Sequence, residues 1–342
     1  MKMIKNMNDK THVSGNNFNL LRLFAAFLVL YGHGHELNNA HLDTVLNHGF
    51  GVYVFFAISG YLIAISWSND PHLLRYFWRR ALRIFPALIL VTLLTVFILG
   101  PLMSNLSYAE YFQHMGTYQY LQNIVLHIHY QLPGVFTNNP FPGSVNGSLW
   151  TLPIEFMLYI SVAAAGLIFR IGKISSIVVL TLCLISNFYY DQLFSSTSIY
   201  SVSVKQIFLM GAFFWTGCAI YHWRISQYFS LNTFGVVLVC AVFLQQWPIF
   251  SALIVYLSVP FLVICFGSTD SGKLNFFNKA DYSYGLYIYA FPVQQSLTYL
   301  FPDWPLTLSI GTCLILTTIL SALSWHFVEK PILRFKPKRK VN

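Results

Sequence analysis

The sequence predicts an all-α fold: a polytopic transmembrane helix bundle of about ten spans with both termini in the cytoplasm. Three observations predict it: the composition, the row of long apolar runs, and the placement of the positive charges between those runs. Of the 342 residues, 56% are hydrophobic and only 9% are charged. Because soluble domains carry about 25% charged residues, this composition is typical of a protein that crosses a membrane several times.

Ten apolar runs of spanning or near-spanning length follow one another along the chain. The seventh and eighth are short and are separated only by the QQWPIF turn, so a single re-entrant hairpin there would change the count. We expect one membrane domain, 1–342, with a cytoplasmic tail at 1–15, an outer segment at 105–148 and a basic cytoplasmic tail at 329–342. The approximate cores of the runs are 18–35, 48–66, 82–104, 149–169, 174–190, 204–222, 231–247, 249–267, 282–301 and 305–327.

The basic residues support this orientation. With the N-terminus inside, every Lys and Arg except Arg22 and Lys205 falls in a predicted inner segment, and the long outer segment 105–148 contains neither residue type. Cytoplasmic loops of membrane proteins carry such an excess of Lys and Arg. The net charge of +9 is therefore attributed to membrane orientation and contact with membrane lipids, and no nucleic acid partner is predicted.

The cysteines give no sign of a covalent or metal framework. The five each fall in a different apolar run, and none belongs to a CxxC pair. We expect them to be small core residues, with no disulfide framework and no metal site. They are Cys183, Cys218, Cys240, Cys265 and Cys313.

The first apolar run contains an unusual pair of polar residues, Arg22 and His33, with ten residues between them. Eleven helical steps return to nearly the same face, roughly 20° off, and rise about 16 Å. The pair therefore marks two depths of one helix stripe. An ionisable group inside a bilayer is costly unless it serves a pathway or a partner, so this spacing predicts a functional site.

His33 suits the role of general base or proton relay, because the unperturbed pKa of imidazole is about 6.5. The alternative is an interfacial histidine that makes one hydrogen bond. His35 follows two residues later, about 200° round the helix, and should point elsewhere. The register with Arg22 favours His33 as the catalytic histidine.

Arg22 and Glu155 each allow two interpretations. Arg22 lies only about a turn into its span, so it can extend to the cytoplasmic interface, or it can bind phosphate or polarise a thioester carbonyl. Glu155, beside Pro153, is the only carboxylate well inside an apolar run. It is expected either to pair with Arg22 or a tyrosine hydroxyl, or to orient His33 as a third catalytic group.

The segment 105–148 is the only sizeable extramembrane piece that the sequence predicts. It is rich in Tyr, His, Asn and Pro. These side chains suit stacking on sugars and hydrogen bonding to hydroxyls, and they equally suit an interfacial helix whose aromatic rings lie at the headgroup level. Both interpretations stay open.

Six short motifs follow one another from about residue 16 to about residue 335. They are NLLRLFAAFLVLYGH, which holds Arg22 and His33, GFGVYVFFAISGYLI at 49–63, FWRRALRIFP at 77–86, GSLWTLPIEFMLY at 147–159, DYSYGLYIYAFPVQQ at 281–295 and FVEKP at 327–331. One alone is a weak signal. The six in this order resemble the membrane-bound acyltransferase family 3, the bacterial O-acyltransferases that modify surface polysaccharides.

One position departs from the family pattern. Where many members have a histidine in Y-L-W-H-x-P, this chain has Ala290, so no role of that histidine is carried over. Ser59, in the second motif, lacks a GxSxG elbow and is interpreted as structural. Tyr284, Tyr287 and Tyr289 are expected to pack and to form hydrogen bonds.

The resemblance implies an O-acyltransferase of the bacterial inner membrane that takes acetyl from cytoplasmic acetyl-CoA. The acceptor would be a sugar hydroxyl of a cell-surface polysaccharide or of its lipid-linked precursor. His33 would act as base, with Arg22 and Glu155 completing the catalytic group. Transfer of succinyl or another short acyl group is an alternative on the same scaffold, and a glycolipid transporter or flippase is an alternative of another class. That transporter predicts an internal repeat and paired helix breaks, which the sequence does not show.

Arg79, Arg80 and Arg83 lie in a predicted cytoplasmic loop and helix start. They can simply fix the orientation and contact anionic lipids. They also suit the pyrophosphate and 3′-phosphate of coenzyme A, because guanidinium groups pair with phosphate through two hydrogen bonds. The resemblance favours this second role, acyl-CoA binding.

Overall fold

The computed structural model describes residues 16–40, 48–169, 172–190, 197–270, 272, 276, 278 and 280–337. The predicted cytoplasmic tail at 1–15 and the end of the basic tail at 338–342 lie outside the described residues. So do three of the basic residues that support the predicted orientation: Arg170, Lys273 and Lys279.

Each of the ten predicted apolar runs coincides with a helix. The helices are α1 (Phe18–Leu37), α2 (His48–Asn69), α3 (Leu73–Leu94), α7 (Thr151–Phe169), α8 (Lys173–Phe188), α10 (Val204–His222), α11 (Leu231–Leu244), α12 (Pro248–Gly267), α13 (Ser283–Leu300) and α14 (Leu306–Ser324). Of the QQWPIF segment, only residues 245–247 separate α11 from α12, because α12 begins at Pro248. α3 continues through η1 (Thr95–Leu99) into α4 (Gly100–Met103). α14 continues through η6 (Trp325–Glu329) and α15 (Lys330–Ile332) into η7 (Leu333–Phe335).

One short hairpin departs from the all-α prediction. β1 (Ser198–Ile199) pairs antiparallel with β2 (Val202–Ser203) just before α10. The two turn residues, Tyr200 and Ser201, have φ angles of +51° and +66°. Two positive φ angles in a two-residue loop are the geometry that matches the twist of a hairpin, so this turn closes two very short strands. The rest of the described chain is helical or irregular.

Five helices of the described chain are long and apolar enough to cross a membrane, by length and composition. They are Gly49–Asn69, Leu73–Met103, Gly147–Ile168, Val204–His222 and Leu306–Phe335, and three shorter apolar helices accompany them. α1 and α13 are outside this set because polar side chains lower their mean hydropathy. These five helices support the prediction of a helical membrane protein, whereas the count of ten spans stays a prediction.

α2 lies at the centre of the bundle, packed against α1, α7, α10 and α12. Glycines bring α2 and α10 into backbone contact. A Cβ at Gly60 would lie 1.8 Å from the carbonyl oxygen of Phe214, and one at Gly217 would lie 2.4 Å from that of Ala57. Small residues permit such close helix approach in membrane proteins. α1 packs against α2, α13 and α14 and makes fewer contacts with α12, and α13 also packs against α14.

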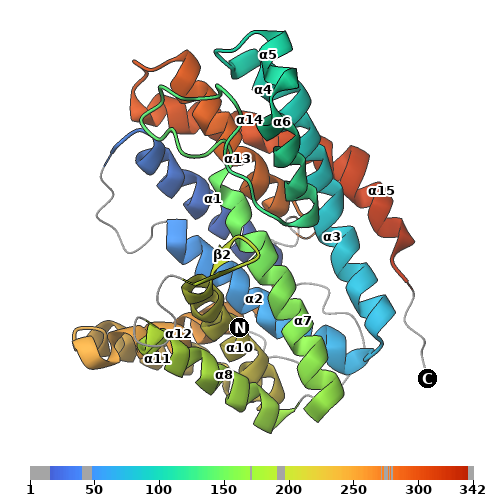
Figure 1. Ribbon diagram of the computed structural model, residues 1–342. Coiled ribbons are helices and arrows are strands. Elements are labelled where there is room, and N and C mark those ends of the chain that lie inside the picture. Colours follow the sequence, from blue (N-terminus) through green and yellow to red (C-terminus); the bar gives the residue numbers. More distant parts are fainter. Residues whose placement is uncertain are drawn as a thin grey trace.

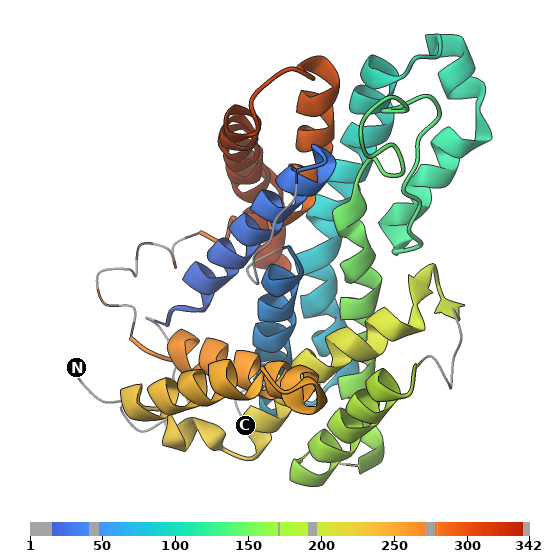
Figure 2. The same ribbon diagram turned by 90° about the vertical axis from the view of Figure 1, so that its left-hand side faces the viewer.

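The segment 105–148 forms a folded cap at one end of the molecule (Figures 1 and 2). It comprises α5 (Tyr108–Gln113), α6 (Met115–Gln119), η2 (Tyr120–Val125), an irregular stretch, and the start of η3 (Gly147–Trp150). The cap has its own buried core, which includes Tyr111, Tyr120 and Phe136. The Tyr111 hydroxyl donates to the carbonyl of Val96, 2.9 Å away, where the π-helical η1 leaves that carbonyl accessible.

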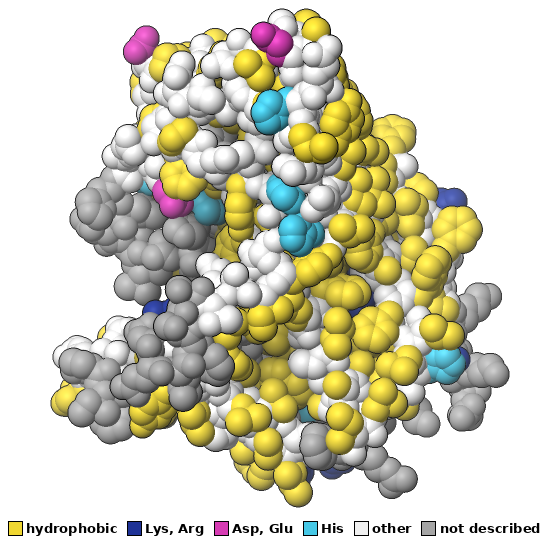
Figure 3. All heavy atoms as spheres, viewed as in Figure 1, with side chains coloured by type: hydrophobic (Ala, Val, Ile, Leu, Met, Phe, Trp, Pro, Cys, Tyr) yellow, Lys and Arg dark blue, Asp and Glu magenta, His cyan; other side chains and the backbone are white. Residues whose placement is uncertain are grey.

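Hydrophobic and polar side chains occupy different parts of the surface in this view (Figure 3). Hydrophobic side chains cover much of the flank, whereas acidic and histidine side chains colour the end where the cap lies. Exposed apolar residues on the flank include Leu102, Leu167 and Ile168, each more than 60% exposed. An apolar flank with a more polar end fits a protein surrounded by lipid.

Candidate active site

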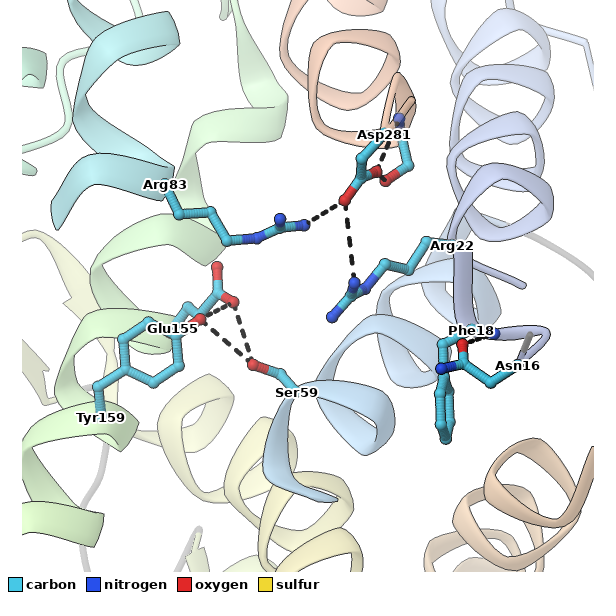
Figure 4. Close-up of polar contacts among 9 residues, drawn as sticks. Asn16, Phe18, Arg22, Ser59, Arg83, Glu155, Tyr159 and Asp281 are labelled. Carbon is cyan, nitrogen blue, oxygen red and sulfur yellow. Dashed lines mark hydrogen bonds and ion pairs between the residues drawn. The ribbon is translucent and has the colours of Figure 1, made fainter. Parts of the chain in front are cut away.

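The structure places the predicted site residues at two levels of α1. We call them the Arg22 end and the His33 end. At the Arg22 end, Arg22 from α1 and Arg83 from α3 converge on one carboxylate, that of Asp281 (Figure 4). The Asp281 Oδ2 atom lies 3.9 Å from Nη1 of Arg22 and 2.8 Å from Nη2 of Arg83. The contact unites three segments that are far apart in the sequence.

Asp281 is fixed by the start of α13. Its Oδ1 atom accepts hydrogen bonds from the backbone N–H and the hydroxyl of Ser283, at 3.3 and 2.5 Å. The carboxylate side chain is only 9% exposed. A buried carboxylate needs such partners, and here two arginines supply the opposite charge. Asp281 was not among the predicted site residues, although an Asp whose side chain can accept from the backbone N–H two residues later is a recognisable Asx-turn pattern.

Glu155 lies close to this cluster but binds hydroxyl groups (Figure 4). Its Oε1 atom accepts a hydrogen bond from the Tyr159 hydroxyl, one turn along α7, and another from Ser59 of α2 at 3.2 Å. The Ser59 and Tyr159 oxygens are themselves 3.3 Å apart. Of the two roles left open for Glu155, the geometry supports the partner of a tyrosine hydroxyl, and the ion pair of Arg22 goes to Asp281 instead.

The three arginines of α3 are not equivalent. Arg79 is buried and pairs with Asp70, which also binds Arg75. Hydrogen bonding from Arg75, with Arg79 beside it, holds the pKa of the Asp70 carboxyl well below its usual range. This clamp ties the start of α3 to the end of α2. α3 begins at Leu73, so these arginines lie on a helix and not partly in a loop, and the ring of His72 caps that start.

Arg80 has a different environment. Its guanidinium carbon lies 5.8 Å from the ring centroid of Tyr76 and 5.9 Å from that of Tyr159, and its Nη2 atom is 3.4 Å from the Ser66 hydroxyl. Among the described residues no carboxylate forms an ion pair with Arg80, and its Nε atom is buried without a hydrogen-bond partner. The Arg80 guanidinium therefore lies near two aromatic rings, and its Nε–H can still donate a hydrogen bond to a ligand.

At the His33 end, the imidazole contacts Glu36 and Phe291 among the described residues. Its Nδ1 atom lies 3.1 Å from Oε2 of Glu36, and its ring meets that of Phe291 of α13 edge to face, with centroids 5.1 Å apart. His33 is 9% exposed. The carboxylate beside His33 is thus Glu36, which was not among the predicted site residues, although the i, i+3 spacing places it on the same helix face.

His35 is oriented differently, as expected. Its Nδ1 atom lies 3.0 Å from the backbone carbonyl of Tyr31, and its ring packs on the Tyr31 ring with centroids 4.5 Å apart. Two histidines in one turn therefore have distinct partners, a carboxylate for His33 and a peptide carbonyl for His35.

The 105–148 cap reaches the His33 end through α13. Asn139 donates to the backbone and side-chain oxygens of Gln295, and Gln295 donates to the carbonyls of Phe141 and Ser144. The Phe141 ring contacts Phe291, the residue that packs on His33. The cap and the α3 arginines thus lie at opposite ends of α1. Within the described ranges, no group of three His, Cys, Asp or Glu side chains converges.

Comparison with known proteins identifies the family. A model described as an acyltransferase domain matches residues 16–326. The chain belongs to this family, the acyltransferase family 3. An O-acetyl transferase of Shigella phage Sf6 is 31% identical over 337 residues, which cover 94% of this chain and 98% of the relative. Nodulation protein 10 of Rhizobium leguminosarum bv. viciae is 28% identical over 366 residues, which cover 95% of each chain. No solved structure matches.

The family match confirms the resemblance that the six motifs indicate. Family membership and the five apolar helices together indicate a helical membrane protein. The roles of His33, Arg22, Glu155, Arg79, Arg80 and Arg83 stay predictions, which the geometry refines.

Proposed function

We propose that the protein transfers acetyl from cytoplasmic acetyl-CoA to a sugar hydroxyl of a cell-surface polysaccharide or of its lipid-linked precursor. One observation carries the proposal. Arg22 of α1 lies beside Arg83 of α3 at one level of the bundle, and His33 of the same α1, with its carboxylate partner, lies about 16 Å further along the helix axis. The name of the phage relative, O-acetyl transferase, supports acetyl as the group transferred.

The Arg22 end suits the phosphates of the donor. Arg22, Arg80 and Arg83 come from two helices, and the carboxylates of Asp281 and Glu155 lie near them. Guanidinium groups bind phosphate through paired, charge-assisted hydrogen bonds. We assign Arg80 and Arg83, with Arg22, to the donor. Arg79 is assigned to the Asp70 clamp that positions the start of α3.

The His33 end suits the chemistry. The acceptor hydroxyl oxygen attacks the thioester carbonyl carbon and gives its proton to Nε2 of His33. The new O–C bond forms as the C–S bond breaks, and the proton passes to the departing thiolate to give free coenzyme A. The flexible arm that separates the phosphates from the thioester of coenzyme A would lie along α1 between the two ends.

The orientation follows from this assignment. Acetyl-CoA is a cytoplasmic molecule, so the Arg22 end would face the cytoplasm, and the 105–148 cap would face outwards in the inner membrane of a bacterium. Ten spans with both termini inside agree with the position of the basic residues. Transfer of succinyl or another short acyl group remains the alternative activity. Membership of an acyltransferase family removes the support for a transporter.

Sealed membrane vesicles test donor and orientation together. Radiolabelled acetyl-CoA added to inside-out vesicles from producing cells should label glycan, because the Arg22 end is then exposed to the medium. Right-side-out vesicles should stay unlabelled until detergent opens them. Equal labelling of both intact preparations would contradict the orientation, and labelling by succinyl-CoA alone would replace the proposed donor.

A further inference from the structure

We infer that Glu36 is a positioning residue for His33: its carboxylate holds the imidazole so that Nε2 faces the acceptor hydroxyl. The inference rests on the proposed function, because it assumes that His33 is the base. It adds a residue that the six motifs do not point to, and it explains why His33 rather than His35 performs the proton transfer.

The contact has the geometry of a histidine–carboxylate pair. Glu36 follows His33 by three residues in the last turn of α1, and Oε2 lies 3.1 Å from Nδ1. A carboxylate accepts hydrogen bonds only, so Nδ1 carries the proton and donates it to Glu36. Nε2 then holds the basic lone pair. The His33 side chain is 11% exposed and that of Glu36 is 42% exposed, so the pair lies at the edge of the buried region.

The helix end that carries this pair is braced. Nδ2 of Asn38 donates to the carbonyl of Gly34 at 2.7 Å, and the Thr298 hydroxyl of α13 lies 3.4 Å from Oδ1 of Asn38. One turn earlier, Nε2 of Gln294 donates to the carbonyl of Leu30 at 2.7 Å. Two side chains of α13 thus hold the last turns of α1 in place. Fixed supports of this kind keep a catalytic group in its productive orientation.

Phe291 supplies a further constraint on the imidazole. Its ring meets the imidazole edge to face at 5.1 Å, so the imidazole plane is fixed by an aromatic contact and by the Nδ1 hydrogen bond. His35 provides an internal comparison. Its Nδ1 partner is the neutral carbonyl of Tyr31, which orients a ring but does not offset a positive charge.

The charge of Glu36 matters at the moment of proton transfer. When the acceptor hydroxyl gives its proton to Nε2, the imidazole becomes an imidazolium ion. A carboxylate at Nδ1 stabilises that ion without itself becoming protonated, and it selects the tautomer that can accept the proton. The proton then leaves Nε2 for the thiolate of coenzyme A, and Glu36 is unchanged.

The test compares Glu36→Gln, Glu36→Asp and Glu110→Gln in membranes at matched protein level. Glu110 is an exposed glutamate of the cap, in the N-terminal turn of α5, and provides the control for loss of one carboxylate. Glu36→Gln should lower kcat for acetyl transfer by about tenfold or more while KM for acetyl-CoA stays within about twofold. Glu36→Asp, which keeps the charge, should recover part of kcat, and Glu110→Gln should behave as the unmodified enzyme.

Two results would overturn the inference. A wild-type kcat in Glu36→Gln would show that the carboxylate is dispensable, and a raised KM for acetyl-CoA with unchanged kcat would place Glu36 in donor binding. His33→Ala, measured beside these variants, separates this inference from the proposed function. An inactive His33→Ala with a fully active Glu36→Gln removes only the role of Glu36, whereas an active His33→Ala removes the base itself.

Discussion

The two ends of α1 use opposite means to hold a polar group inside an apolar bundle. At the Arg22 end, charges from α1, α3 and the start of α13 meet on Asp281, and the hydroxyl-bound carboxylate of α7 lies nearby. At the His33 end, one imidazole and one carboxylate of the same helix form the pair, with an aromatic ring beside them. The first arrangement suits a ligand dense in negative charge, and the second suits a neutral hydroxyl that must lose a proton.

His33→Ala tests most directly whether the His33 end is catalytic and the Arg22 end binds the donor. Loss of a general base costs about 10²- to 10⁴-fold in rate, so acetyl transfer should fall by at least about a hundredfold. Binding of acetyl-CoA should persist, because the phosphates are held at the other end of the helix. Labelled acetyl transferred to glycan measures the first quantity, and retention of labelled acetyl-CoA by purified membranes measures the second.

His35→Ala is the matched control for this variant, since His35 lies on the same turn and, among the described residues, its ring hydrogen-bonds only the carbonyl of Tyr31. His35→Ala should retain most of the transfer rate. If His33→Ala transferred acetyl at nearly the wild-type rate, His33 would not be the base, and the His33 end would not be the catalytic end.

The sequence revealed the His33 end more fully than the Arg22 end, for a physical reason. Residues of one helix have a fixed spacing, so the register of Arg22 and His33 could be calculated from rise and rotation alone. The ten apolar runs likewise gave the positions of ten helices, because burial in lipid or in a bundle demands long apolar segments.

Contacts between distant segments could not be derived in this way. Asp281 is more than 250 residues from Arg22, and only the packing of α13 against α1 brings them together. The same packing sends Glu155 to Ser59 and Tyr159 and not to His33. Nor could the sequence show that the 105–148 segment has a core of its own, since that core combines η1 with residues up to Val145.

Arg79 and Arg80 are neighbours on α3, and their substitutions should have different effects. Arg80→Gln should raise KM for acetyl-CoA by about tenfold or more, because one charge-assisted hydrogen bond is worth about 1.5–3 kcal/mol. Arg79→Gln should instead reduce the unfolding free energy by about 3 kcal/mol, since it breaks a buried ion pair with Asp70. Steady-state kinetics in membranes and thermal unfolding in detergent measure the two effects.

Two outcomes of these measurements would contradict the roles assigned to Arg79 and Arg80. A rise in KM for Arg79→Gln equal to that for Arg80→Gln would return Arg79 to the donor site, as the motif alone suggested. Stability loss in both variants with unchanged KM would mean that the α3 arginines serve only folding and orientation.

The smallest expected effect concerns Ser59, whose hydroxyl bonds to Glu155 and lies beside Tyr159. Ser59→Ala removes one hydrogen bond of about 1 kcal/mol, while Glu155 keeps its bond to Tyr159, so transfer should fall by roughly fivefold or less. Ser161→Ala, on α7, is the control because, among the described residues, the Ser161 hydroxyl bonds only the carbonyl of Leu158 one turn earlier. The measurement also decides the chemistry. If Ser59 carried the acetyl group as a covalent intermediate, Ser59→Ala would abolish transfer, and label from acetyl-CoA would remain on the unmodified protein after denaturation. A fivefold loss with no bound label keeps Ser59 as a support for Glu155, and it leaves the transfer step to the His33 end of α1.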